Sequence, residues 1–93
     1  MIAPSSVLQA RADVRYRVVD RRAILIRQSE AEVVVLNEVG ARTLELLQPG
    51  TPVQGVLDAL ATEFEVDRPD LDRDVLSFLR ELVETGILEE VGS

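Results

Sequence analysis

The spacing of apolar residues along the chain changes once, near Asn37. Residues 14–19 alternate between apolar side chains and arginines, which is the period of a strand with one buried face. Residues 22–28 and 31–36 are two further runs rich in β-branched residues, and a two-residue connection precedes each of them. Three such runs with short connections predict a small antiparallel sheet.

Beyond Asn37 the apolar residues recur every three or four positions, which is typical of helices packed by one face. Local signals set the boundaries of three helices: Asn37 caps Glu38–Leu47, Thr51 and Gln54 form a capping box for a helix reaching Phe64, and Asp67 caps a helix that ends near Thr85, before Gly86. Ile87 and Leu88 follow as an apolar tail that can pack back on the core. Strands followed by helices predict an α+β fold.

Length and composition restrict the classes of protein that fit. Ninety-three residues suit one domain, and we expect residues 1–12 to be a flexible N-terminal segment and residues 13–90 to be the domain. The chain has no cysteine and no histidine, which removes disulfides, thiol nucleophiles and imidazole catalysis. The N-terminus lacks the features of a signal peptide, and no apolar run approaches the ~18 residues of a membrane span. We therefore expect a cytoplasmic protein without membrane contact.

Charge is distributed unevenly about a net value of −7. Six arginines and two acidic residues lie between positions 11 and 27, whereas three arginines and eleven acidic residues follow position 49. An acidic half repels a phosphate backbone, which argues against nucleic-acid binding. A winged-helix DNA-binding protein stays an alternative, but its third helix would carry Asp70, Asp72 and Asp74 where basic side chains are needed.

The sequence offers little for catalysis. Asp70, Asp72 and Asp74 stand at the start of a helix, where carboxylates complement the helix dipole. No glycine-rich phosphate loop is present, and serine and threonine hydroxyls have no histidine or lysine beside them to act as a base. We therefore expect neither an enzyme nor a bound cofactor or metal.

Two segments carry more apolar residues than a plain fold needs. The third strand, Glu32–Leu36, is apolar on both faces, so an open edge there would suit addition of a partner's strand. On the third helix, Leu71, Val75, Phe78 and Leu82 make a core stripe, and Leu76, Leu79 and Val83 widen it beside Arg73 and Arg80. The widened flank predicts a groove. For the strand, the alternative is burial within the chain or in a homodimer; for the helix, the alternative is a helix that is simply buried more deeply.

Four motifs together resemble the PqqD family, the small proteins of pyrroloquinoline quinone synthesis, and related peptide-recognition domains of ribosomal peptide pathways. The motifs are Val35-Leu-Asn-Glu-Val-Gly-Ala-Arg42, Leu46-Leu-x-x-Gly50, Val56-x-x-x-Leu60-Ala-x-x-Phe64, and Asp74-Val-Leu-x-Phe-Leu-x-x-Leu82 with Gly86-Ile-Leu88. The resemblance covers about residues 14–90. It implies a winged-helix-like fold without catalysis that binds the leader of a precursor peptide as an added strand and presents it to a modifying enzyme, a radical S-adenosylmethionine protein in quinone synthesis.

The resemblance places the peptide between the third strand and the third helix. The residues expected to bind it are Glu32, Val33, Val34, Val35 and Leu36 on the strand, and Arg73, Leu76, Leu79, Arg80 and Val83 on the helix. The chain departs from many relatives at Leu44, where an aromatic is common, and at Gln48-Pro-Gly50, where Asp-Gly is common. A lasso-peptide or other ribosomal peptide pathway is therefore the alternative to quinone synthesis.

Arginines of the first two strands suggest a second contact. Arg15, Arg17, Arg21, Arg22 and Arg27 form a basic hairpin in the predicted sheet. Surface charges of this kind raise association rates with an oppositely charged partner. We expect the hairpin to dock against an acidic patch on the modifying enzyme or on the leader.

Overall fold

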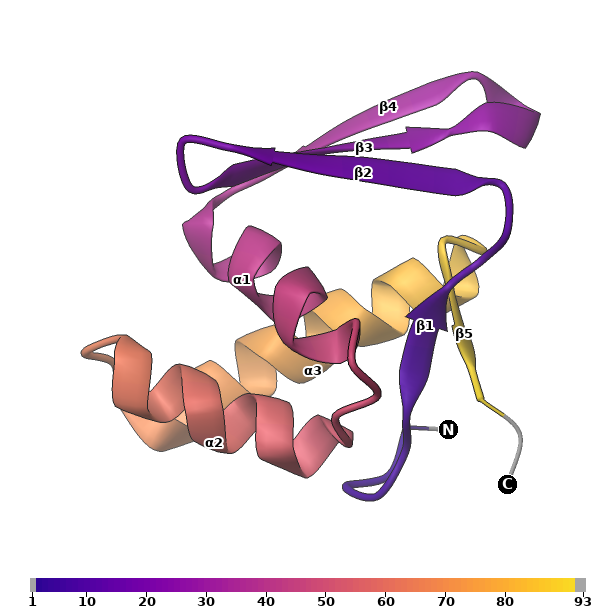
Figure 1. Ribbon diagram of the computed structural model, residues 1–93. Coiled ribbons are helices and arrows are strands. Elements are labelled where there is room, and N and C mark those ends of the chain that lie inside the picture. Colours follow the sequence, from indigo (N-terminus) through magenta and orange to yellow (C-terminus); the bar gives the residue numbers. More distant parts are fainter. Residues whose placement is uncertain (1, 92–93) are drawn as a thin grey trace.

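A computed structural model describes residues 2–91 and shows a sheet lying over a layer of helices (Figure 1). The elements in chain order are β1 (Leu8–Ala10), β2 (Val14–Val19), β3 (Arg22–Arg27), the short 3-10 helix η1 (Gln28–Glu30), β4 (Glu32–Leu36), α1 (Glu38–Leu47), α2 (Val53–Glu63), α3 (Arg68–Glu84) and β5 (Leu88–Glu90). The predicted order of three strands and then three helices is confirmed, as is the α+β class.

The strands β2, β3 and β4 form an antiparallel sheet in that order. Asp20 and Arg21 join β2 to β3 with φ angles of 51° and 67°, the left-handed pair of a type I′ turn, whose twist matches that of the strands. The second connection is η1, followed by Ala31 at a φ of 50°. The strand ends agree with the predicted runs to within one residue.

The first and third helices begin and end close to the predicted positions. The side chain of Asn37 accepts a hydrogen bond from the Gly40 amide at 2.9 Å, so Asn37 caps α1 as expected. Asp67 stands at the cap position of α3, although its side chain accepts no hydrogen bond from the helix. Gly86 follows α3 with a φ of 83°, the left-handed stop that its position predicted.

The start of α2 differs from the prediction. Thr51 does not cap this helix, which begins at Val53 after Pro52 and has no side-chain cap. Instead, the Val53 amide donates to the Ser6 carbonyl at 2.8 Å and the Gln54 amide donates to the Pro4 carbonyl at 2.9 Å. The N-terminal segment therefore satisfies the free amides of α2, a task that the sequence assigned to a local capping box.

The N-terminal segment also differs from the flexible leader that we expected over residues 1–12. Met1 lies outside the described residues, but Leu8–Ala10 is a strand that pairs antiparallel with β5, with Leu8 opposite Glu90. Leu8 is fully buried, and Ile87 and Leu88 are buried as predicted for the apolar tail. Strands of three residues are too short to show a period, which is why this second sheet was missed.

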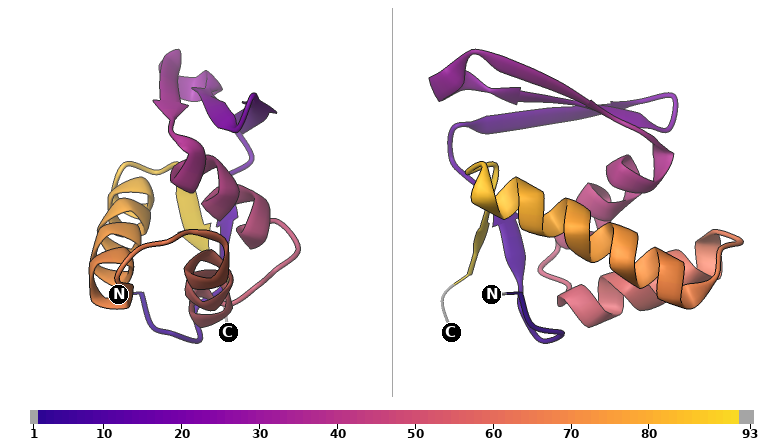
Figure 2. Two further views of the ribbon diagram at one scale, coloured as in Figure 1. Left: turned by 90° about the vertical axis from the view of Figure 1, so that its left-hand side faces the viewer. Right: turned by 180° about the vertical axis from the view of Figure 1, so that it is seen from behind.

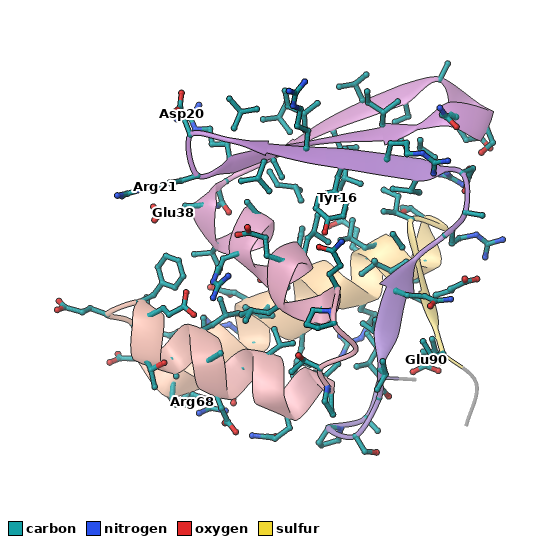
Figure 3. The ribbon with its side chains drawn as sticks, viewed as in Figure 1. Tyr16, Asp20, Arg21, Glu38, Arg68 and Glu90 are labelled. Carbon is teal, nitrogen blue, oxygen red and sulfur yellow. The ribbon has the colours of Figure 1, made fainter. Side chains whose placement is uncertain are left out.

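The core lies between the lower face of the β2–β4 sheet and the helices (Figure 2). The sheet contributes Val14, Ala23, Leu25 and Leu36, all of them buried. Tyr16 points from β2 toward α1, and its hydroxyl donates to Oε1 of Gln48 at 3.0 Å (Figure 3). On α3 the buried residues are Leu71, Val75, Leu79 and Leu82.

Candidate functional site

Strand β4 is an edge of its sheet, with β3 on one side and no strand of the described chain on the other. The two residues that flank a two-residue hairpin turn, here Val19 and Arg22, are hydrogen-bonded to each other through their backbones. Along the rest of the β2–β3 ladder, hydrogen-bonded and non-hydrogen-bonded pairs then alternate. The Gln28 amide, which donates to the Asp13 carbonyl at 2.9 Å, continues the same alternation.

This alternation decides which backbone groups of β4 are free. On β3, every second residue points its backbone N–H and C=O groups toward β4. These residues are Ala23, Leu25 and Arg27, and they pair with Leu36, Val34 and Glu32 of β4. Val33 and Val35 therefore turn their N–H and C=O groups to the open edge. These two residues are also the most exposed large apolar residues of the described chain.

A cavity of about 410 Å³ lies beside this edge, between the β4–α1 junction and α3. In the right-hand view of Figure 2, β4 and α3 lie on the same side of the molecule, with the strand above the helix. The lining is mostly apolar, with one amide and two carboxylates: Val35, Leu36, Asn37, Val39, Gly40, Val66, Asp70, Leu71, Asp74, Val75 and Phe78. An extended peptide paired with β4 would extend the sheet over this cavity.

Gly40 allows the first turn of α1 to approach both other walls of the cavity. A Cβ atom at this position would lie 3.2 Å from Cβ of Leu36 and 3.4 Å from Cζ of Phe78. Even an alanine at position 40 would require Leu36 to shift slightly and would contact the ring of Phe78, so a larger side chain would take up space in the cavity. The glycine therefore helps to set the width of the groove. We define the groove by its three walls, which are β4, the start of α1 and the side of α3 that faces them.

The charged groups along the groove are paired. Near the start of α3, Arg73 contacts Asp70 at 3.1 Å and Asp74 at 3.5 Å. At the other end of β4, Arg27 contacts Glu30 at 3.9 Å and Glu32 at 3.6 Å. The groove therefore has an apolar centre, and the charged side chains at each of its two ends are paired with one another.

Arg27 also packs tightly against the end of α3. A Cβ atom at Gly86 would lie 2.9 Å from Nη2 of Arg27, so the guanidinium occupies the space that a side chain would need. A cation at this end of a helix interacts favourably with the helix dipole. Arg27 thus belongs to the helix-facing side of the sheet, apart from the other arginines of the hairpin.

Carboxylates with lowered pKa values lie outside the groove and serve structural contacts. A hydrogen bond from Ser29 lowers the pKa of Asp13, one from Arg68 lowers the pKa of Asp58, and one from Arg42 lowers the pKa of Glu63. Within residues 2–91 no cluster of three acidic side chains could hold a metal ion. No helix of the same residues is long and apolar enough to cross a membrane.

The structure places the residues expected on β4 along the groove, in two orientations. Val33 and Val35 are exposed, whereas Val34 is half-buried on the helix-facing side and Leu36 is buried there. Glu32 is exposed at the start of the strand. The open edge and its position beside α3 therefore agree with the expectation, while a contact of these residues with a peptide stays a prediction.

The residues expected on α3 do not line the cavity, although Arg73 pairs with Asp70 and Asp74, which do. Leu79 is fully buried in the core, Leu76 and Val83 are half-buried, and Arg73 and Arg80 are exposed; none of the five lines the cavity. The helix is rolled so that Asp70, Asp74 and Phe78 border the cavity, on the other side of the core stripe. Their spacing of four residues was visible in the sequence, but periodicity does not tell which border of a stripe faces the sheet.

The sequence pattern of one protein family, described as "Coenzyme PQQ synthesis protein D (PqqD)", matches residues 22–88. The chain belongs to the PqqD family. Among relatives of this PqqD-family chain is a "PqqA binding protein" from Rhodopseudomonas palustris strain CGA009, 30% identical over 76% of this chain and 70% of that protein. Another, from strain TIE-1, is 27% identical over 90% of this chain and 80% of that protein.

Two solved structures are similar to the PqqD-family chain along nearly their whole length. One is TbiB1 in complex with the TbiA(beta) leader peptide, with a TM-score of 0.81 and 29% identity over 91% of this chain and 99% of that one. The other is a lasso peptide synthetase B1 complexed with the leader peptide, with a TM-score of 0.79 and 25% identity over 89% and 98%. The predicted family and fold are therefore confirmed.

Proposed function

We propose that this chain is a non-catalytic recognition module that binds the leader segment of a ribosomally made precursor peptide. The leader adds to the open edge of β4 as an antiparallel strand, and its inward side chains enter the groove. The observation that carries the proposal is the juxtaposition of free backbone groups at Val33 and Val35 with an apolar cavity of about 410 Å³. Relatives named for binding PqqA, and similar structures that hold leader peptides, support it.

The bound leader is then presented to a modifying enzyme of the same pathway. A radical S-adenosylmethionine enzyme is the partner that family membership favours, and a lasso-peptide pathway is the alternative that the similar structures favour. Both place the module in the cytoplasm, where precursor peptides are synthesised. A gene for a short precursor beside a gene for either enzyme would distinguish the two pathways.

Binding needs both the edge and the groove. Two residues with free N–H and C=O groups offer about four hydrogen bonds, which at ~0.5–1.5 kcal/mol each contribute roughly 2–6 kcal/mol. Association costs an estimated ~4–15 kcal/mol. Burial of about 300 Å² of apolar surface adds roughly 7–8 kcal/mol. Only the sum of both contributions approaches the about −8 kcal/mol of a micromolar complex.

The role of the open edge is tested with two substitutions at Val33, by measuring the affinity of each variant for the cognate leader in a calorimetric titration. Val33→Pro removes an N–H that faces the open edge, and we expect at least a tenfold loss of affinity with the fold retained. Val33→Thr keeps the N–H and the β-branched shape, so it should bind like the parent. Val34→Pro is unsuitable, because Val34 faces Leu25 and its N–H belongs to the internal ladder. Parent-like affinity in Val33→Pro would refute strand addition at this edge.

The groove is tested by comparing the two borders of α3. Phe78→Ala removes a wall of the cavity and should weaken leader binding about tenfold or more, whereas Val83→Ala lies on the far border and should leave it near the parent value. Circular dichroism melts check that both variants fold. The opposite order of affinities would place the peptide beside Leu76 and Val83, the border expected from the sequence.

A further inference from the structure

The face of the β2–β4 sheet that points away from the helices is apolar and uncovered. Figure 1 shows no helix or strand above this sheet, and the same holds for the other views of residues 2–91 (Figure 2). Its central side chains are exposed: Ile24 at 39%, Ile26 at 43%, Val33 at 63% and Val35 at 65%. Ile24 lies opposite Val35, and Ile26 lies opposite Val33, so the four form one continuous patch.

Arginines border this patch on the side of β2. Arg17 lies opposite Ile24 and Arg15 lies opposite Ile26, while Arg22 stands on the same face of β3. Within the described part of the chain none of the three forms an ion pair; Arg15 donates only to the carbonyls of Ala12 and Val14. In a chain with a net charge of −7, this is a locally basic surface whose charges lack partners.

The patch is hollowed on both sides of Ile24. One hollow of about 500 Å³ is lined by Val19, Asp20, Arg22, Ile24 and Val35, and one of about 220 Å³ by Arg15, Tyr16, Arg17, Ile24 and Ile26. Each hollow combines apolar side chains with arginine. Surfaces that combine an exposed apolar centre with a charged border are typical of protein–protein contacts.

We infer that this outer sheet face docks the modifying enzyme, through an apolar surface of that enzyme surrounded by carboxylates. The inference rests on the proposed function for the identity of the partner. Charge complementarity gives the sign: three unpaired arginines favour an acidic border on the partner, which steers association and raises its rate. The outer sheet face thus lies on the opposite side of the sheet from the groove, and Val35 borders both.

A second copy of the chain fits this face less well. A symmetric dimer uses the same patch on both subunits, so it would bring three further arginines against the three that border the patch. The area is also small. Three strands about 4.8 Å apart and about 17–20 Å long cover roughly 250–300 Å², whereas a specific interface takes about 800 Å² from each partner.

Because the outer sheet face is smaller than a specific interface needs, we expect the enzyme to contact a further surface beside it. Val35 lines both the groove and the larger hollow of the outer face, so a leader paired with β4 would continue both surfaces. Every second side chain of the leader would then lie on the outer sheet face, beside Val33 and Val35. The enzyme would contact the module and these leader residues together, and the leader should therefore raise the affinity of the module for the enzyme.

The test uses the purified modifying enzyme from the gene cluster that encodes this chain, with and without the cognate leader. Arg17→Glu and Ile24→Thr change the outer sheet face on strands that do not meet the leader. Each should weaken association with the enzyme at least tenfold while leader affinity stays at the parent value. Arg11→Glu is the matched control, because it makes the same charge change beside Glu89, away from this face. For the parent, association should weaken as salt rises.

Three outcomes would overturn the inference. Enzyme affinity that is unchanged in both variants would place the docking surface elsewhere. A parent dimer in sedimentation that dissociates on Ile24→Thr would show that a second copy covers the face. Loss of leader affinity in Arg17→Glu would show that the leader itself lies there. If the parent protein binds the enzyme but no leader, the proposed function is refuted, whereas the inference that the outer sheet face docks the enzyme is not.

Discussion

The two faces of the β2–β4 sheet are built from similar residues but stand in opposite surroundings. The helix-facing side carries Val14, Ala23, Leu25 and Leu36, and the outer side carries Ile24, Ile26, Val33 and Val35. The first set is buried on the side of the sheet that faces the helices, and the second is exposed. Apolar character alone therefore does not decide which residues make the core. On this sheet the inner face stabilises the fold, whereas the outer face is exposed to solvent and is the surface that we propose for contacts with a partner.

The largest difference between the faces should appear in stability. Leu25→Ala removes a fully buried side chain and should lower the free energy of unfolding by about 2–5 kcal/mol. Ile24→Ala, its neighbour on the outer face, should cost less than about 1.5 kcal/mol, since much of that side chain already meets solvent. Urea unfolding at neutral pH measures both. Equal losses would mean that the outer face is covered in solution.

A smaller contrast is expected on β2, between Tyr16 inside and Arg17 outside. Tyr16→Phe removes the hydrogen bond to Gln48 and should cost about 0.5–1.5 kcal/mol. Arg17→Ala should stay within about 0.5 kcal/mol of the parent. If Arg17→Ala is the more destabilising of the two, the arginine has a structural role that its exposed position does not indicate.

The same tyrosine reports the inner face through its pKa. Burial raises the pKa of Tyr16 above its usual value of 10.0, and the nearby charge of Glu45 raises it further. The folded state therefore holds this proton more tightly than the unfolded state, so the contribution of Tyr16 to stability should be fully present below about pH 10 and be lost as pH rises through the folded pKa. Tyr16 is the single tyrosine of the chain, and absorbance titration with and without urea can follow it alone.

The smallest effect is expected at an ion pair that belongs to neither face. Arg42 on α1 donates to Glu63 at the end of α2, through Nε at 2.7 Å and Nη2 at 3.1 Å, and lowers the pKa of that carboxyl. Because the folded pKa lies below the unfolded value, the contribution is present above about pH 4.5 and lost as pH falls through the folded pKa. Glu63→Gln should lower the melting midpoint at pH 7 by less than about 4 °C, since the pair is exposed. The difference from the parent should shrink as pH falls below about 4.5.

Regular patterns in the sequence predicted the parts of the fold that depend on local order. The alternation in residues 14–19, the cap at Asn37 and the stop at Gly86 each act within a few residues, and each is confirmed. The turn at Asp20-Arg21 was found from its length, although it lacks the glycine that its positive φ angles favour. Local signals suffice where the hydrogen bonds themselves are local.

Contacts between distant segments were beyond such patterns. Strands β1 and β5 are three residues each and lie about 80 positions apart, so neither shows a period by itself. The first amides of α2 are satisfied by Pro4 and Ser6, which no capping rule anticipates. For the candidate site, the two apolar faces of β4 marked this strand for attention, but they fitted burial as well as an open edge, and the sheet order decides for the edge. The border of α3 that meets the groove was not predictable, because it depends on how the helix rolls against the sheet.

The open edge of β4 bears on the colloidal behaviour of the protein. Natural sheets usually protect an edge with proline, a bulge or inward charge, and Glu32-Val-Val-Val-Leu36 has a single charge at one end. If β4 of one copy pairs with the β2 edge of another, each pair leaves an open edge at both ends and can begin a growing aggregate. The net charge of −7 opposes such encounters at low salt, so aggregation should become faster as salt screens it. A strand that occupies the edge would act as a shield, and a ligand peptide should keep the protein dispersed at concentrations where the empty form precipitates.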